Sequence, residues 1–86
     1  MWQIVLSSKA KKQSKTALKS PYRQAIEDLM KIIAVNPFQT PPPYEKLEPP
    51  TSSSYSRRIN KQHRLSYRVY DEDKVVKILS LWTHYE

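Results

Sequence analysis

The N-terminal part of the chain changes from strand-like to helix-like spacing of its hydrophobic residues. Residues 2–6, Trp-Gln-Ile-Val-Leu, are rich in strand-forming types and predict a short strand. Ser7 or Ser8 can then cap a helix that runs to about Lys19, because a serine oxygen accepts from the free N–H groups of a first helical turn. The apolar stripe of this helix is thin: Ala10, Ala17 and Leu18.

A second helix is predicted to follow directly. Ser20-Pro21 has the composition of a helix start, with serine as the N-cap and proline at the first helical position. The helix should end near Asn36-Pro37, since the residue before a proline is pushed out of the helical region. Hydrophobic residues recur between these limits at helical spacing, so one face of the helix should be buried: Ala25, Ile26, Leu29, Met30 and Ile33.

Prolines dominate the connection that follows. We expect Phe38 to hold this connection to the core, and the stiff run 41–43 to aim residues 44–47. A linker or a ligand for proline-binding domains is the ordinary interpretation of such a run. Its position inside a very small domain favours a rigid connection instead.

The C-terminal part alternates between apolar and polar residues. Residues 64–69 alternate between polar and apolar types, and residues 55–60 follow the same spacing with Arg57 at one of the core-side positions. The mostly apolar stretch 75–82 predicts a central strand. Turns are expected at 60–62 and 71–73, where Asn and Asp tolerate the left-handed conformation. The resulting order, β-α-α-β-β-β-β, predicts an α+β fold with a mostly antiparallel sheet and two helices on one face.

The net charge of the chain indicates which kinds of partner it could bind. The chain has 86 residues, enough for one small domain over 1–86, with 15 Lys and Arg against 8 Asp and Glu and a net charge of +7. This balance favours a polyanion such as nucleic acid, an acidic protein or an anionic membrane surface. Many small basic proteins are merely basic, so charge alone leaves the function open.

Missing residue types exclude several chemistries. No cysteine is present, which removes disulfides, thiolate catalysis and Cys-based zinc sites and favours a cytoplasmic setting. No glycine is present either, which excludes Gly-rich phosphate loops. The N-terminus lacks the charge order of a signal peptide, and no stretch approaches the length of a membrane helix. With only two histidines and no cluster of acidic ligands, neither a metal site nor another cofactor is expected.

The first predicted helix carries a run of lysines without any acidic residue. A solvated helix face and a surface that faces a polyanion are equally good interpretations, because like charges at this spacing repel one another. The lysines are Lys9, Lys11, Lys12, Lys15 and Lys19.

Strand parity gathers chemically useful side chains on the open face of the sheet. Arg64 alternates with apolar residues and so points away from the core, and Arg58 should join it from the neighbouring strand. Trp82 and His84 take the same phase on the last strand, and Glu45 enters after the prolines. The positions assigned to the core side are Leu65, Tyr67, Val69, Leu79 and Leu81.

Each of these residues alone is a weak signal, since a surface arginine is usually solvated. Together they suit the cleavage of RNA by its own 2′-hydroxyl, which needs a base, a cation for the phosphate charge and an acid for the leaving oxygen. Glutamate, arginine and histidine can fill these roles without a metal, and the pKa of histidine lies near neutrality.

Five motifs occur in order along the chain: Asn36-Pro37-Phe38, Glu45-x-Leu47, Tyr55-Ser56-Arg57-Arg58-Ile59, His63-Arg64-Leu65-x-Tyr67 and the final His84-Tyr85. This combination resembles that of the Txe/YoeB family of toxins, within the wider RelE-like superfamily. The resemblance spans the chain by element order and is sharpest from residue 36 to residue 85.

The resemblance implies a microbial-ribonuclease-like, RelE-like fold and an mRNA interferase, a ribosome-dependent endonuclease that inhibits translation. It implies Glu45 as general base, Arg64 as the residue that stabilises the phosphate charge, and His84 as general acid. Arg58 would contact phosphate, and Tyr85 would position the substrate. The implied partners are mRNA on the 70S ribosome and a cognate acidic antitoxin of the YefM or Axe type, with a homodimer left open.

Two departures from the family pattern concern substrate contacts. Members commonly have a lysine three residues after the glutamate, where this chain has Glu48, which leaves Lys46 as a substitute. Members often have an arginine two residues before the final histidine, where this chain has Trp82, a residue that could stack on a base or pack in the fold.

Two rival interpretations remain at this point. A non-catalytic basic module could bind RNA or an acidic protein through the same face, and would lose little on replacement of Glu45 or His84. A structural domain with a solvated basic face would not account for the terminal His84-Tyr85 pair.

Overall fold

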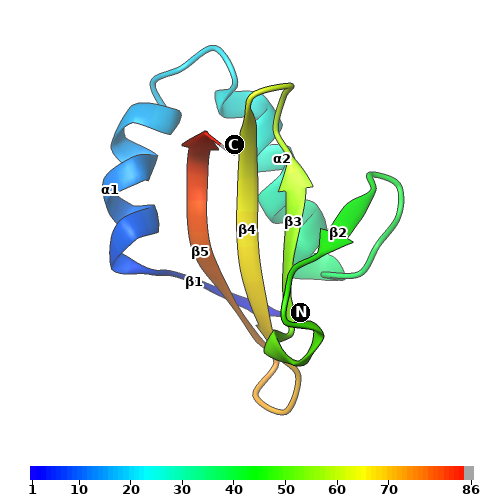
Figure 1. Ribbon diagram of the computed structural model, residues 1–86. Helices are drawn as coiled ribbons and strands as arrows, with labels where there is room; N and C mark the ends of the chain where they lie inside the picture. The colour runs from blue at the N-terminus through cyan, green and yellow to red at the C-terminus, as the bar shows by residue number, and fades with distance from the viewer. Residues whose placement is uncertain (85–86) are drawn as a thin grey trace.

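The computed structural model describes the backbone of residues 1–84 and the side chains of residues 1–82, as an α+β fold in the predicted element order (Figure 1). The two helices are α1 (Ser8–Ala17) and α2 (Arg23–Val35). The strands are β1 (Gln3–Leu6), β2 (Tyr44–Lys46), β3 (Ser54–Arg58), β4 (His63–Tyr70) and β5 (Val75–His84), with a short 3₁₀ turn, η1 (Pro50–Ser52), before β3.

The strands form one sheet in the order β1-β5-β4-β3-β2. Strands β1 and β5 are parallel, and the other described pairs are antiparallel, as predicted. Helix α2 crosses behind the sheet and α1 lies beside β5, so neither helix covers the face towards the viewer of Figure 1. We call this uncovered side the open face.

Helix α1 closes the edge of β5 beyond its pairing with β1. The Ser7 hydroxyl donates to the Leu79 carbonyl at 2.7 Å, and the Leu81 N–H donates to Gln13 Oε1 at 2.8 Å. These bonds satisfy backbone groups that an unpaired strand edge would otherwise leave exposed. The long C-terminal strand is thereby held between β4 on one side and β1 with α1 on the other.

The hydrophobic core lies between the sheet and the helices. Both helices contribute, which confirms the stripe predicted for α2 and, in α1, Ala10 and Ala17; Leu18 was wrongly included, because it follows the end of α1 and is exposed. None of the described helices is long and apolar enough to cross a membrane. The buried core residues are Ala10, Ala17, Ile26, Leu29, Ile33, Leu65, Tyr67, Val69, Val76, Ile78 and Leu81.

The helix caps agree with the sequence at one end and differ at another. Ser7 caps α1 by accepting from the Ala10 N–H at 3.0 Å, as predicted. The predicted start of α2 at Ser20-Pro21 is wrong, because the Ser20 hydroxyl donates to the Ala17 carbonyl at 2.6 Å and accepts from the Tyr22 N–H at 3.1 Å. The serine therefore closes a turn between the helices, and α2 begins later, at Arg23.

One turn places its left-handed residue elsewhere than expected, and the other uses the expected asparagine through its side chain. In the turn after β4 the left-handed position falls on Lys74 (φ 56°) and not on an aspartate. In the turn after β3 the Asn60 side chain accepts from the N–H groups of Gln62 at 2.8 Å and His63 at 2.7 Å. The Asn60 side chain thus stabilises this tight turn, a position where other proteins often use glycine.

Because β4 and β5 pair irregularly, the prediction of which β5 side chains face the core is wrong in part. The register shifts between Arg64 and Ser66 and again between Ser66 and Tyr67, so β5 contains extra residues relative to β4. Val76, Ile78 and Leu81 are buried whereas Leu79 is only half-buried, so the assignment of Leu79 to the core was wrong. Each extra residue reverses the side to which the following side chains point.

Candidate active site on the open face

The open face brings a carboxylate and a guanidinium into direct contact. Glu45 lies on the edge strand β2, and its backbone pairs with Ser56 of β3. Arg64 Nη1 on β4 lies 2.8 Å from Glu45 Oε1 and donates to the Ser56 hydroxyl at 3.1 Å. Three strands therefore place three polar side chains at one point, as strand parity and the position of the proline run predicted for Glu45 and Arg64.

A pocket of about 410 Å³ opens around this contact. Arg58, which is exposed and directly opposite Arg64 in the register, lies on its wall. The lining residues are Glu45, Leu47, Ser56, Arg58, Lys61, Gln62 and Arg64. A neighbouring hollow of about 270 Å³ adds Pro43 and Tyr44 to the same central residues. Three cations against one carboxylate make the pocket suited to an anion.

The two partners of the ion pair differ in exposure. The Arg64 side chain is 19% exposed and is fixed by both Glu45 and Ser56, whereas the Glu45 side chain is 65% exposed. The pair therefore presents an anchored cation beside a carboxylate that remains accessible from solvent. A phosphate in the pocket could contact the guanidinium while the carboxylate accepts a proton from a neighbouring hydroxyl.

Lys46 does not reach this pocket. It directly follows Glu45 on β2, so the two side chains point to opposite sides of the sheet. Its backbone partner Tyr55 likewise belongs to the helix-covered side, where its ring contacts Tyr67 at 5.8 Å. Strand parity applied to β2 would have shown that Lys46 is a poor substitute for the lysine that the family carries elsewhere.

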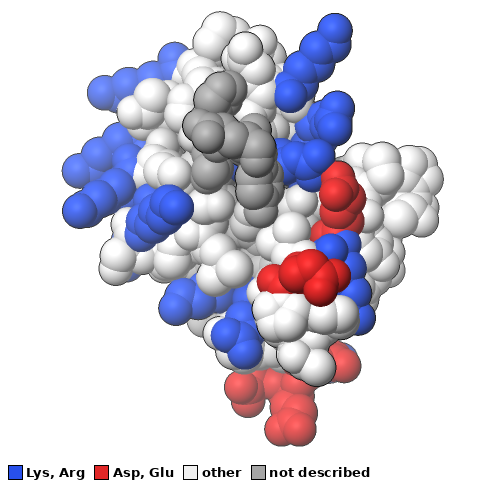
Figure 2. All heavy atoms as spheres, in the orientation of Figure 1, with Lys and Arg blue, Asp and Glu red and all other residues white. Residues whose placement is uncertain are grey.

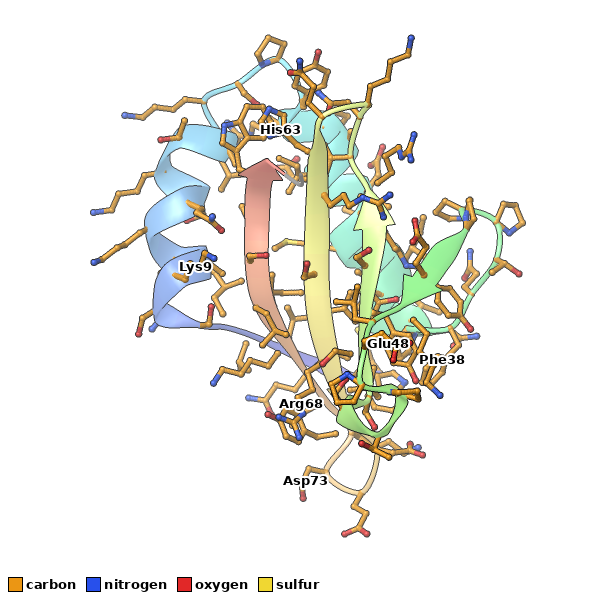
Figure 3. The ribbon with its side chains drawn as sticks, viewed as in Figure 1. Lys9, Phe38, Glu48, His63, Arg68 and Asp73 are labelled. Atoms are coloured by element: carbon orange, nitrogen blue, oxygen red, sulfur yellow. The ribbon has the colours of Figure 1, made fainter. Side chains whose placement is uncertain are left out.

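Trp82 was wrongly assigned to the open face. Its ring stacks on the His63 ring at 3.8 Å and 10°, and it contacts Tyr22 at 5.8 Å. It is partly buried against the hydrophobic core, and its φ of 65° accompanies the irregular pairing of β5. This aromatic stack lies at the end of the sheet where Figure 3 labels His63, and it anchors the end of β5.

The two terminal residues of the prediction are described only in part. The backbone of His84 pairs with His63 at the end of β5, which continues the strand to this residue. The side chain of His84 and the whole of Tyr85 lie outside the part of the chain that the structure describes. Their expected roles therefore remain predictions.

Arg57 is a structural residue that we did not single out from the sequence. It is 1% exposed and donates to three oxygens: the Tyr67 hydroxyl at 3.1 Å, the Pro42 carbonyl at 2.6 Å and the Pro37 carbonyl at 3.0 Å. Its guanidinium also lies 5.1 Å from the centre of the Tyr44 ring. Parity could have identified it, since Arg57 alternates with Arg58 and so must point into the core.

The contacts of Arg57 fix the strand that carries Glu45. Pro37 and Pro42 bound the connection from α2 to β2, and Tyr44 is the first residue of β2. Burial raises the pKa of the Tyr67 hydroxyl, which stays protonated and donates to the Pro37 carbonyl at 2.8 Å. The buried guanidinium of Arg57 and the neutral Tyr67 hydroxyl thus fix the proline-rich connection by hydrogen bonds, although β2 itself pairs over only a short length.

Replacing Arg57 should therefore destabilise the fold far more than replacing its neighbour. We expect Arg57→Ala to lower the free energy of unfolding by about 3 kcal/mol, because buried oxygens lose a charged donor. Arg58→Ala, a matched arginine on the exposed side, should change it by less than about 0.5 kcal/mol. Urea unfolding followed by circular dichroism measures both, and equal losses would show that the buried contacts are not what holds the connection.

The chain is similar to known toxins over most of its length. A family model described as YoeB-like toxin of bacterial type II toxin–antitoxin system matches residues 11–85. A protein named Toxin YoeB from Synechocystis sp. is 41% identical over 58 residues, which are 67% of this chain and 65% of that toxin.

Solved structures extend the similarity over nearly the whole chain. The toxin of a heterotetrameric YoeB-YefM toxin–antitoxin complex from Staphylococcus aureus has a TM-score of 0.79 at 33% identity, covering 99% of both chains. A YoeB dimer from the same organism has a TM-score of 0.78 at 32% identity, covering 98% of both chains.

Proposed function

The chain belongs to the YoeB-like toxins of bacterial type II toxin–antitoxin systems, and from this premise we propose that it is an endoribonuclease that cuts mRNA on the ribosome. The observation that carries the proposal is the contact of Arg64 with Glu45 inside a pocket lined by further cations. A pure binding surface has no need for a carboxylate beside the cation, because the carboxylate repels the phosphates that the cation attracts.

The proposed reaction uses the ribose hydroxyl of the RNA as the nucleophile. The Glu45 carboxylate takes the 2′-hydroxyl proton, and the 2′-oxygen attacks the adjacent phosphorus. Arg64, with Arg58 opposite it in the register, stabilises the extra negative charge on the phosphate oxygens. His84 gives a proton to the departing 5′-oxygen, and Tyr85 positions the substrate. The products are a 2′,3′-cyclic phosphate and a 5′-hydroxyl, and no metal is required.

The lysines of α1, together with Lys19 just after it, offer a separate surface for ribosomal RNA. All five are exposed: Lys9, Lys11, Lys12, Lys15 and Lys19. They project from the side of the molecule next to the open face, where Figure 2 shows a group of basic side chains and Figure 3 labels Lys9. Contacts of this kind would hold the protein on the ribosome without sequence preference and would weaken with salt.

An acidic antitoxin is the proposed protein partner. The relative from Staphylococcus aureus is described in complex with YefM, and the basic pocket of this chain suits an acidic segment that folds on binding. Occupation of the pocket would block access to Glu45 and Arg64. Self-association is a further proposal, because a toxin dimer is described for the same organism.

Expression in bacteria tests the proposed activity and the partner together. The chain expressed alone should arrest growth, and its cleaved mRNA should carry 5′-hydroxyl ends. Co-expression of an acidic reading frame adjacent to its gene should restore growth and yield a co-purified complex. Growth arrest with intact mRNA would reject the nuclease, and failure of that frame to relieve toxicity would reject the proposed partner.

A further inference from the structure

The open face carries a second basic position at a distance from the pocket. Arg68 lies on β4 four residues after Arg64, so both point to the open face, about 13 Å apart at 3.3 Å per residue. Lys77 of β5 lies directly opposite Arg68 in the register. Figure 3 places Arg68 on the lower part of this face, on the side of the turn that contains Asp73.

The sheet thus repeats one arrangement along its strands. Arg58 opposes Arg64 in one row, and Arg68 opposes Lys77 in the other. Directly opposed like charges destabilise a sheet, because their Cβ atoms are only about 5 Å apart. In the first row Glu45 relieves the repulsion through its contact with Arg64. An anion bound between Arg68 and Lys77 would do the same in the second row.

Both cations of the second row are available to such an anion. Arg68 is exposed and Lys77 is half-buried, and the Arg68 guanidinium lies 5.2 Å from the centre of the Tyr70 ring, which keeps it extended along the face. Among the described residues, neither Arg68 nor Lys77 has a carboxylate within ion-pair distance. The nearby Asp71 pairs instead with Lys74 at 3.5 Å.

Serines connect the two basic rows. Ser56, Ser66 and Ser80 face one another across three neighbouring strands, in line with Glu45 on β2. All three are buried and short, and the Ser56 hydroxyl already accepts from Arg64, so no further charged side chain stands between the two basic rows on these strands. A polynucleotide could therefore follow β4 from one basic row to the other.

An acidic turn marks where this path should stop. A hollow of about 260 Å³ beyond Arg68 is lined by that arginine together with Asp71, Glu72 and Asp73. Figure 2 shows these acidic side chains at the end of the molecule, below the basic ones of the face. Phosphates would be attracted as far as the second row and repelled past it.

We propose that Arg68 and Lys77 form a second phosphate site for the RNA strand whose scissile phosphate lies at Arg64. This inference rests on the proposed endoribonuclease function. A stacked strand advances about 3.4 Å per nucleotide and an extended one about twice that, so the second site holds a phosphate about two to four nucleotides away. The site sets the length of RNA that the protein grips.

Binding of a short RNA tests the second site without any need for cleavage. The probe is an oligonucleotide of about ten nucleotides with a 2′-deoxy sugar at the scissile position, followed by fluorescence anisotropy at low salt. The double variant Arg68→Gln/Lys77→Gln should bind about five- to twentyfold more weakly, with a salt slope reduced by about 0.7, the value for one lost phosphate contact on a single strand. The matched control Arg23→Gln/Lys31→Gln removes the same charge from α2, on the other side of the sheet, and should change binding less than about twofold.

Neutral methylphosphonates placed at each linkage in turn locate the contact. One linkage, about two to four nucleotides from the scissile one, should weaken binding to the unmodified protein about five- to tenfold and leave binding to the double variant unchanged. The second site would be overturned if the methylphosphonate weakened binding equally in the unmodified protein and the double variant. It would also be overturned if the double variant bound RNA normally but lost affinity for the acidic antitoxin. A neutral scissile linkage should weaken both proteins, and if it weakens neither, the proposed nuclease site itself is wrong.

Discussion

Glu45→Gln, Arg64→Ala and His84→Gln should each slow mRNA cleavage by about 10²- to 10⁴-fold and abolish growth arrest. Glu45→Gln keeps the size of the side chain and its contact with the guanidinium but removes the proton acceptor. Arg64→Ala removes the cation that touches both Glu45 and Ser56. His84→Gln removes the imidazole that the proposed reaction uses as its proton donor. Single-turnover cleavage on ribosomes measures each loss.

Control variants distinguish the loss of a catalytic group from a general loss of charge and from unfolding. Glu48→Gln removes a carboxylate from the loop after β2, and Arg23→Ala removes an arginine from α2, where it pairs with Glu27 at 3.0 Å. Both variants should arrest growth as the unmodified chain does. All variants should keep the circular dichroism spectrum of the fold. Full toxicity of His84→Gln would refute its role as the acid, and full toxicity of Glu45→Gln would favour a non-catalytic binding module.

The element order was predictable because local periodicity determines most of it. Helical spacing identified α1 and α2, and the period-two spacing of residues 55–60 and 64–69 identified β3 and β4. The start of α2 was not predictable from Ser20-Pro21, because the same residues also suit a turn between two helices. Periodicity shows that a helix exists more reliably than it shows where that helix begins.

The candidate site was predictable only where the strands are regular. Parity for Arg64 and the position after the proline run for Glu45 placed the two on one face correctly, since β2, β3 and β4 pair without interruption around them. It failed for Trp82, because the extra residues in β5 depend on tertiary pairing with β4 and leave no local signature in the sequence.

The isolated open face offers little to hold a substrate in the geometry that the reaction demands. In-line attack requires the 2′-oxygen, the phosphorus and the leaving oxygen to be aligned, and such orientation is worth about 7–11 kcal/mol. The pocket around Arg64 is wide and solvent-accessible, and Glu45, its proposed base, is 65% exposed. In the proposed reaction, much of the alignment would therefore come from a partner that already holds the mRNA extended, for which we propose the decoding site of the ribosome.

The purified protein should accordingly cut an mRNA codon on programmed ribosomes at least on the order of 10³-fold faster than the same RNA free in solution. A single 2′-deoxy substitution at the scissile nucleotide should abolish cutting on the ribosome, because it removes the nucleophile but leaves the phosphates and bases in place. A 2′-deoxy substitution at a neighbouring nucleotide serves as the matched control and should be cut normally. Equal rates on free and ribosome-bound mRNA would reject the ribosome as the source of alignment, whereas efficient cutting of the scissile 2′-deoxy substrate would reject attack by the 2′-hydroxyl altogether.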